Sequence, residues 1–511
     1  MVSTFHSIET AKRSLFTHTT ALSTTGHNIA NANTPGYSRQ RVNMNASISI
    51  DALGMNRSMA PGQLGTGVEF NSITRIREAF LDTQYRGEAN ASGSWNIQSD
   101  SLSKLEGIFN EPSDTGIRTV MDQFWKSWSE LSKDPENETT RKIVKETAVA
   151  MTDAFNYMSR QLDSLSQDLT TNVGVKANEV QNYLTSIADL NDSIRKLESL
   201  GDNANDLRDQ RDLFTDKLSQ IVNITVQESD QGYTISMGAQ QLVNGTAVTQ
   251  VDSAFLENAY NAGGITGGEV YGMLYSRDVY VADYQQQLNN MANTLANGDV
   301  QVTLPKGSVL PPGVTVAGVT GRNVTEDTVV TVKGLNGLHQ LGYTLDGTTK
   351  GGLPFFEAQG GGAITAGNIR LNAQIEENPK LIASSMRTVG TEPNEQVVAG
   401  SNSLALLISN LKDLKFQSPG GTQTGTIDSL YSSLVGQLGV QGQEASRQTE
   451  NASLLLQQVD SRRQSVSGVS LDEEMSDMIK FQHAYNASAR FMTTFDEMLD
   501  KLINSTGLVG R

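Results

Sequence analysis

Residues 141–170 read RKIVKETAVAMTDAFNYMSRQLDSLSQDLT and set the architecture of this 511-residue chain. Their apolar positions alternate between spacings of four and three residues, which is the period of one face of an α-helix. These positions are Val144, Ala148, Met151, Phe155, Met158, Leu162, Leu165 and Leu169. The stripe resumes at Val173, continues to Leu197 and stops before Gly201. We therefore predict one helix over residues 138–200, roughly 90 Å long at about 1.5 Å per residue and longer than a compact domain.

The same apolar spacing recurs on both sides of this helix. It runs from Ala91 to Phe109 before a break at Asn110-Glu111-Pro112, from Val120 to Leu131, and from Leu434 to Val459. Long helices with one apolar stripe bury that stripe against one another. The pattern predicts a mainly α, elongated protein. Its frame would be a long helical bundle or coiled coil built from discontinuous N- and C-terminal segments, with inserted β-rich outer domains.

Both ends of the chain also carry apolar heptads. In the first helix the repeated positions are Ile8, Leu15, Leu22 and Ile29. In the last helix they are Met478, Tyr485, Met492 and Leu499, with Leu471 and Met475 in the same seam. Ser470 stands three residues before Glu473, which predicts a capping box at the start of this helix. Because chain ends usually fray, two such helices favour a protein that polymerises through its ends, and we predict both stripes as assembly interfaces.

Strand-like segments interrupt the helical pattern. Residues 223–250 predict a hairpin around an Asp230-Gln231-Gly232 turn, and the helical period returns over residues 270–297. Residues 299–357 are glycine-rich and strand-like, with strands predicted at Val300–Val302, Val314–Val316, Val329–Val332 and Tyr343–Leu345. The resulting domains are an N-terminal helix and arm at 1–70 paired with the C-terminal helix at 460–511, a helical rod at 71–225 completed by 265–298 and 364–459, a β-hairpin module at 226–264, and a β-rich inserted outer domain at 299–363.

Composition excludes several classes of partner. A formal net charge of −17 argues against nucleic acid and against an anionic membrane surface. Residues 1–80 hold seven basic and four acidic residues (+3), and residues 466–511 hold four basic and seven acidic residues (−3), so the two ends have opposite charges. The chain has no cysteine, which removes disulfides, thiol catalysis and zinc–thiolate sites. No apolar run is long enough for a membrane span, and no signal-peptide pattern is visible.

No catalytic or metal-binding pattern stands out. None of the five histidines, which are His6, His18, His27, His339 and His483, has another histidine at metal-ligand helical spacing. Walker and dinucleotide-binding glycine motifs are absent as well. The acid-rich segment Asp202–Asp212 fails the spacing of a calcium loop and predicts a solvated helix start. We expect a protein that is not an enzyme and needs no cofactor.

Residues 28–37 read NIANANTPGY and join the first helix to an extended arm. A residue before proline is extended, and Pro-Gly makes a tight turn, so the chain turns sharply here. The string, through Asn28, Asn31, Asn33, Thr34, Pro35, Gly36 and Tyr37, resembles the N-terminal signature of the bacterial flagellar rod, hook and hook-associated proteins. Residues 467–474, SGVSLDEE, resemble the C-terminal signature of the same family.

Other stretches are similar to the members of this family at the hook–filament junction. They are Tyr37–Gln40, Gly65–Val68, Asp206–Asp212, Phe355-Phe356 and Asn378–Ala383. The resemblance covers nearly the whole chain apart from residues 299–335. It implies a structural subunit between the bendable hook and the stiff filament, with terminal helices lining the axial core and β domains facing outward.

The resemblance also implies partners and a location. The expected partners are further copies of the chain in a ring or helical layer, the hook protein, the second hook–filament junction protein and a cytosolic export chaperone that binds the C-terminal helix. The expected location is the extracellular flagellum, reached through the flagellar type III apparatus without a cleaved signal peptide. Two alternatives are another axial subunit (hook, rod or flagellin-like) and, from a different class, a coiled-coil surface adhesin.

We further hypothesise that residues 1–33 and 470–505 fold on assembly. Each stripe alone lacks enough partner surface to offset the entropy of ordering a helix. Stacked on each other and on neighbouring subunits, the stripes would bury apolar area worth about 25 cal/mol per Å².

Overall fold

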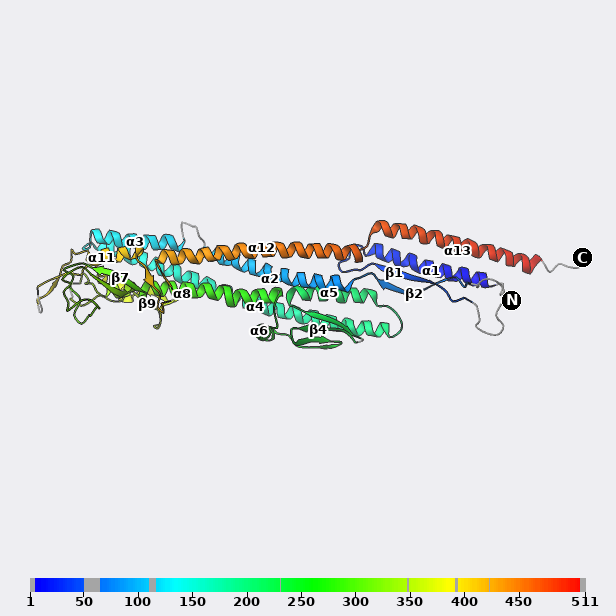
Figure 1. The fold of residues 1–511 in the computed structure, drawn as a ribbon, viewed down its shortest axis with the longest axis horizontal. Coiled ribbons are helices and arrows are strands. Elements are labelled where there is room, and N and C mark those ends of the chain that lie inside the picture. The colour runs from blue at the N-terminus through cyan, green and yellow to red at the C-terminus, as the bar shows by residue number, and fades with distance from the viewer. Residues whose placement is uncertain are drawn as a thin grey trace, which may run out of the picture. The chain divides into compact units, whose positions relative to one another are not determined.

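The computed structural model describes residues 5–49, 65–109, 116–229, 231–346, 349–390, 394–421 and 423–505. Helices dominate the chain, as Figure 1 shows. The chain folds into two compact units, each made of segments that are far apart in the sequence. Unit 1 contains residues 1–94, 174–271 and 449–511, and unit 2 contains residues 95–173 and 272–448. The mainly α fold predicted from the sequence is confirmed.

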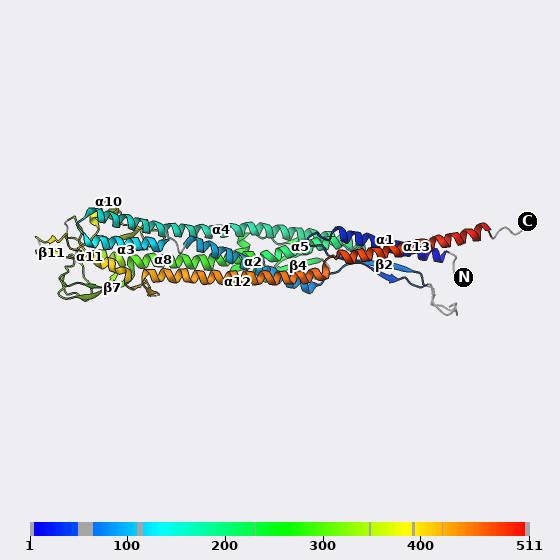
Figure 2. The same ribbon diagram turned by 90° about the horizontal axis from the view of Figure 1, so that it is seen from above.

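The helices predicted from the apolar stripes are present. The central one is α4 (Glu138–Glu198), and the flanking stripes lie on α2 (Ala79–Phe109), α3 (Ile117–Lys133) and α12 (Ile427–Ser467). Figure 2 shows α4 and α12 as long continuous helices. All eight apolar positions of the opening stripe of α4, from Val144 to Leu169, are buried. The break predicted at Asn110-Glu111-Pro112 lies outside the described residues.

In unit 1 the two terminal helices are partners. α1 (His6–Ala30) and α13 (Leu471–Ser505) lie side by side in both views (Figures 1 and 2). They run in opposite directions, because Ser14 contacts Ser488, whereas Asn28, further along α1, contacts Glu474, which is earlier on α13. The arm after α1 forms an antiparallel ribbon of β1 (Gln40–Ala46) and β2 (Val68–Arg75), which packs against α1.

A small sheet packs on the helices of unit 1. It contains β3 (Thr225–Ser229), β4 (Gly232–Met237), β5 (Gln240–Asn244) and β6 (Ala247–Val248) in sequential antiparallel order. The predicted hairpin is therefore confirmed as β3–β4, although Asp230 of its turn lies outside the described residues. Asn191 of α4 fastens this sheet, because its amide donates to the carbonyl oxygens of Tyr233 and Gly245 at 3.1 and 2.8 Å. Helices α5 (Asn205–Ile221) and α6 (Ser253–Asn261) flank the sheet in sequence.

The helix predicted over residues 270–297 is present with an internal irregularity. It consists of α7 (Gly268–Tyr275), a π-helical segment η1 (Ser276–Val281) and α8 (Ala282–Asn297). In unit 2, a four-stranded sheet follows with the order β14–β13–β7–β8. Its long strands β7 (Asp299–Leu304) and β8 (Thr328–Lys333) come from the strand-like segment, and β13 (Phe416–Gln417) and β14 (Thr424–Gly425) come from far downstream.

Two strand predictions in this region are wrong. Residues 314–316 are irregular and lie between two turns, and Tyr343 makes only an isolated bridge, to Ser385. The physical reason for the first is the flanking backbone, because Gly313 and Gly318 have positive φ angles of 79° and 91° that turn the chain away from an extended path. Residues 334–339, also expected to be strand-like, form the short helix α9 (Gly334–His339).

Unit 2 has a dense aromatic core. Phe124 and Trp128 of α3 meet Phe355 and Phe356, and His339 packs against Trp128 and Phe355. The remaining elements of unit 2 are short: β9 (Phe356–Ala358), β10 (Ile369–Leu371), α10 (Ala373–Glu377), η2 (Pro379–Leu381), β11 (Thr388–Val389), β12 (Gln396–Val397), α11 (Ser403–Asn410) and η3 (Leu411–Asp413).

His339 makes the stability of unit 2 sensitive to pH. The side chain is fully buried, its Nε2 accepts from the backbone N–H of Ala383 at 2.8 Å, and its Nδ1 donates to the carbonyl oxygen of Leu353 at 2.6 Å. Burial lowers the pKa of His339 to about 4. Because the folded pKa lies below the unfolded one, this stabilisation is complete above about pH 6.5 and is lost as the pH falls towards 4.

We expect unit 2 to lose about 3 kcal/mol of its free energy of unfolding between pH 7 and pH 4 through His339. His339→Gln, which keeps a donor and an acceptor but carries no charge, should flatten this dependence. Tryptophan fluorescence during urea unfolding at each pH measures the free energy of unfolding of unit 2 selectively, because Trp95, Trp125 and Trp128 all belong to that unit. His483→Gln on the exposed face of α13 is the control, and parallel pH profiles for wild type and His339→Gln would contradict the assignment.

Candidate functional site

The NIANANTPGY turn is built as the residues predict. α1 ends at Ala30, the N–H of Thr34 donates to the carbonyl oxygen of Asn31 at 2.9 Å, and the N–H of Tyr37 donates to that of Thr34 at 3.2 Å. Gly36 has a φ of +81°, and a Cβ there would lie 3.0 Å from the side chain of Leu213. A side chain at this position would thus be strained and crowded. Asn33, Thr34 and Pro35 are exposed, and the turn leads directly into the arm.

Asn28 is the buried centre of this region, with 1% of its surface exposed. Its Oδ1 accepts from the hydroxyl of Tyr37 at 2.8 Å and from the N–H of Gln40 at 3.0 Å. Its Nδ2 donates to the carbonyl oxygen of Gln40 at 2.9 Å and to Oε2 of Glu474 at 3.0 Å. The amide therefore joins the end of α1, the turn, the first residue of β1 and the first turn of α13.

The arm also binds α13 through Arg39. Its Nε donates to Oε1 of Glu474 at 2.6 Å, its Nη1 lies 2.5 Å from Oε2 of Glu473, and its Nη2 lies 3.6 Å from Asp477. We call Asn28, Arg39, Gln40 and Glu474 the clasp. The N-terminal and C-terminal signature motifs thus meet in space. Ser470 directly precedes α13 and Glu473 is exposed and bound to Arg39, so the capping box stays a prediction.

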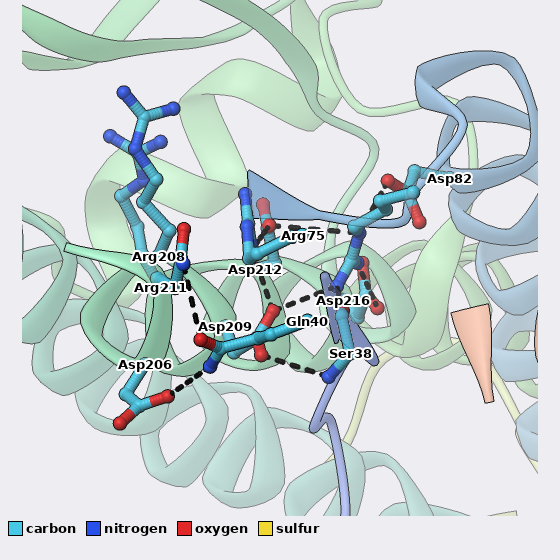
Figure 3. A network of polar contacts seen from close by, with 12 residues as sticks. Ser38, Gln40, Arg75, Asp82, Asp206, Arg208, Asp209, Arg211, Asp212 and Asp216 are labelled. Carbon is cyan, nitrogen blue, oxygen red and sulfur yellow. Dashed lines mark hydrogen bonds and ion pairs between the residues drawn. The ribbon is translucent and has the colours of Figure 1, made fainter. Parts of the chain in front are cut away.

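A second polar cluster lies on α5 (Figure 3). Nη1 of Arg75 is 2.7 Å from Asp209 and 2.9 Å from Asp212, and Asp209 also accepts from the N–H of Ser38 at 2.8 Å. Asp216 is bound by Arg86 of α2 at 2.8 Å and by Arg463 of α12 at 2.5 Å. We call Asp209, Asp212 and Asp216 the α5 aspartates. They gather arginines from the arm, α2 and α12 on one helix face.

The solvated helix start predicted for Asp202–Asp212 is wrong for the second half of that segment, because Asp209 and Asp212 are buried, as is Asp216 just beyond it. Burial by itself raises the pKa of Asp212, but the charges of Arg77, Arg75 and Arg86 outweigh it and lower that pKa to about 2. Burial raises the pKa of Asp209 despite its contact with Arg75. The local sequence around residue 209 does not predict this burial, because the arginines that neutralise the carboxylates are distant in the chain.

The arginines of the same segment turn the other way. Figure 3 shows Arg208 and Arg211 directed away from the α5 aspartates. Arg208 binds Glu198 at 2.7 Å, and Arg211 binds Glu228 at 2.9 Å. The guanidinium of Arg211 also lies 3.5 Å from the centre of the Tyr233 ring. α5 therefore fastens the arm with one face and the β3–β6 sheet with the other.

The structure places the predicted heptad residues in a shallow interface. Ile8, Leu15, Leu22 and Ile29 are each half-buried, as are Met478, Met492 and Leu499. Leu471, Met475 and Tyr485 are exposed. The buried residues of α1 are instead small or polar: Ala11, Thr17, Ala21, Thr24, Thr25 and Asn28. Among the α13 side chains that the structure describes, only Glu474 is buried.

Sequence reasoning missed Arg39 and Glu474 as interface residues. The available signals were the opposite charges of the two ends and the acidic run Asp472–Glu474, which we interpreted as helix-dipole and capping chemistry. Within the described ranges, no group of three or more acidic or histidine side chains is arranged to hold a metal ion. In the same ranges, no helix is long and apolar enough to cross a membrane.

Three stretches match known protein families. Residues 8–37 match the flagella basal body rod protein family, and residues 460–505 match the C-terminal family of flagellar basal body rod FlgEFG proteins. These two define the class as a flagellar axial protein. Residues 102–299 match the helical domain of flagellar hook-associated protein FlgK.

Relatives are similar over the full length. Flagellar hook-associated protein 1 of Bacillus subtilis is 35% identical over 100% of both chains. Proteins of the same name from Escherichia coli and Salmonella typhimurium are 26% and 25% identical over 95% of this chain and 96% and 97% of theirs. A solved structure of the flagellar hook junction protein FlgK from Burkholderia pseudomallei has a TM-score of 0.49 and 14% identity, covering 75% of this chain and 100% of that chain.

The chain therefore belongs to the flagellar hook-associated protein 1 family. The predicted family and the structural role at the hook–filament junction are confirmed. The family is one of flagellar structural components that assemble with other axial proteins, and it is not an enzyme family. The matches to rod and hook families cover only the two ends of the chain, whereas the relatives that match along its whole length favour the hook-associated protein over another axial subunit or a surface adhesin.

Breaking the α5 cluster should destabilise unit 1. In Asp212→Asn, the guanidiniums of Arg75, Arg77 and Arg86, whose side chains are only 11–12% exposed, lose a shared buried anion, which should cost about 3–5 kcal/mol. The measurement is hydrogen exchange of the α5 amides. Asp206→Asn removes a half-exposed carboxylate of the same helix and should change exchange little. Equal protection of α5 in Asp212→Asn and wild type would refute the importance of the cluster.

Proposed function

We propose that this chain builds the hook–filament junction by packing α1 and α13 of each subunit against the same helices of neighbouring subunits. The observation that carries this proposal is the exposure of α13. Large apolar side chains of α13 are exposed at Leu471, Met475, Ile479, Phe491, Met498, Leu502 and Ile503, with exposed fractions between 43% and 70%. Leu471 repeats the heptad position of Met478 and Leu502 repeats that of Ser488, whereas the other five occupy different heptad positions and form the outward stripe of α13. On α1, Phe16 is 69% exposed. Apolar surface of this extent on a helix pair is typical of an assembly interface.

The pairing within one chain leaves the seam incompletely buried. Ile8, Leu15, Leu22 and Ile29 contribute half-buried side chains, and Met478, Tyr485, Met492 and Leu499 face them only in part. A helix pair with so little buried surface gains little beyond the entropy cost of ordering it. This supports the hypothesis that residues 1–33 and 470–505 reach their full order only in the assembled layer, where neighbouring copies cover the exposed stripe.

The remaining partners are proposed from the family. On the two axial sides of the layer we place the hook protein and the second hook–filament junction protein. Nucleic acid and membrane are not partners, and the chain performs no catalysis and takes no cofactor. We retain the proposed division into 1–70 with 460–511, 71–225 with 265–298 and 364–459, 226–264 and 299–363, in which the last two face outward.

Export is the second part of the proposal. The chain leaves the cell through the flagellar type III apparatus and reaches the extracellular flagellum without a cleaved signal peptide. A cytosolic chaperone covers the apolar stripes of α13 beforehand. Support comes from the exposure of those stripes and from the absence of cysteine, which leaves no disulfide to hinder unfolding.

The assembly proposal is tested by Ile479→Ser combined with Met498→Ser. These outward residues are 54% and 50% exposed, and the loss of their burial against neighbours should cost about 3 kcal/mol, or roughly a hundredfold in affinity. Electron microscopy of cells that carry this variant as their only copy should show hooks without filaments. Val440→Ser on α12, which is 69% exposed, is the matched control. Normal filaments on the double variant would contradict the proposal.

The chaperone proposal uses the seam-facing stripe instead. Replacing Met478, Tyr485, Met492 and Leu499 together with serine should reduce capture of the co-expressed export chaperone at least tenfold, because these side chains would no longer supply apolar contacts. Chaperone capture by the double variant Ile479→Ser and Met498→Ser is measured in parallel, and the variant that loses more capture identifies the face of α13 that the chaperone covers. Undiminished capture by both variants would place the chaperone site elsewhere in the chain.

A further inference from the structure

The apolar stripes of α1 and α13 do not define how the two helices align along their axes. Ile8, Leu15, Leu22 and Ile29 repeat every seven residues, and so do Met478, Tyr485, Met492 and Leu499. If one helix slides by seven residues, about 10 Å along the axis, apolar positions again face apolar positions. Such a slide loses only one layer of apolar contacts, at the end of the helix pair. Apolar packing therefore permits several alignments of similar stability.

The line of α1 that faces α13 is equally tolerant. Positions 7, 14, 21 and 28 carry Ser, Ser, Ala and Asn. Ser14 meets Ser488 with 2.7 Å between the two hydroxyl oxygens. A slide by seven residues would place Ser7 or Ala21 opposite Ser488. Each of these small side chains fits where Ser14 stands, so this line resists sliding only weakly.

The clasp is the exception along this interface. Glu474, the one buried side chain of α13 within its described length, takes hydrogen bonds from Asn28 at 3.0 Å and Arg39 at 2.6 Å. After a slide by seven residues in one direction it would face Ala21, and in the other it would pass the end of α1. Its carboxylate would then lose the Asn28 contact, and Asn28 would lose an acceptor. Separating two buried polar partners costs free energy. A buried pair that stays matched contributes more to the specificity of the alignment than to its stability.

We propose that Asn28 and Glu474 set the register of α1 against α13. This deepens the proposed function and rests on it only in taking the helix pair as the unit of assembly. Since Asn28 also holds Gln40 and Arg39 also holds Glu474, the same contacts fix the start of the β1–β2 arm relative to α13. Each subunit then presents the outward stripe of α13 at one height relative to its arm. Identical stacking of subunits requires this uniformity.

Disulfide trapping in the purified full-length chain measures the register directly, because the chain has no cysteine of its own. Ser14→Cys with Ser488→Cys reports the register of the structure. Ser7→Cys or Ala21→Cys with Ser488→Cys reports a slide by seven residues in either direction. Oxidation traps each pairing as it forms, so the relative rates of the three crosslinks can be compared even when the helices pair for part of the time. Monomeric crosslinked chains are separated from crosslinked dimers by gel mobility.

In the wild-type background the 14–488 crosslink should form fastest. Glu474→Met, which removes the buried carboxylate and keeps its volume, should raise the slipped crosslinks relative to the 14–488 crosslink about tenfold, which corresponds to about 1.4 kcal/mol. Asn28→Leu should act in the same direction from the other helix. Glu497→Met, an exposed substitution of the same kind on α13, is the matched control and should leave the ratio unchanged.

Two outcomes would overturn the proposal. If slipped crosslinks stay as rare in Glu474→Met and Asn28→Leu as in Glu497→Met, the apolar seam sets the register by itself. If all three crosslinks vanish in both variants, the clasp is needed for pairing and not for its register. Because the readout lies within one chain, its failure is distinct from a failure of assembly through the outward stripe of α13, which is scored on flagella.

Discussion

The burial of carboxylates on α5 and at the start of α13 is the constraint on which unit 1 depends. Asp209, Asp212 and Asp216 are removed from water, and each is bound by arginines that come from other parts of the chain. Arg75 arrives on the arm, Arg86 on α2 and Arg463 on α12. A buried charge that loses its partner is strongly destabilising, so these segments must converge on α5 for unit 1 to fold.

The two units use different kinds of packing. Unit 2 closes around large aromatic side chains such as Phe124, Trp128 and Phe355, which leave little freedom to rearrange. In the helix pair α1–α13, the buried residues of α1 are small or polar, whereas the large apolar side chains of both helices are half-buried or exposed. This inversion suits a segment that completes its core with neighbouring molecules. It also explains why polar contacts carry unusual weight at this pair, since apolar shape defines its alignment poorly.

The two family signatures have a common physical purpose in this chain. The NIANANTPGY turn brings Arg39 and Gln40 beside Asn28, and the SGVSLDEE segment starts α13 with Glu473 and Glu474 pointing at Arg39. Neither motif is complete alone, because Glu474 needs donors from the first and Asn28 needs an acceptor from the second. Motifs more than four hundred residues apart in sequence thus form one local structure.

The sequence by itself determined the helices and the family. Strict periodicity over Val144–Leu169 was sufficient for α4, because burial on one face dictates spacing within a single helix, and the NIANANTPGY turn followed from local backbone chemistry. Tertiary structure alone decided which carboxylates are buried. From the sequence, Asp209 and Asp212 of the α5 aspartates were predicted to belong to a solvated helix start, because their arginine partners lie elsewhere in the chain. Glu474 was predicted to be part of a capped helix end. Residues 314–316 failed as a strand for a related reason, since alternation of apolar residues is a local property, whereas strand formation needs a partner edge and a backbone free of intervening turns.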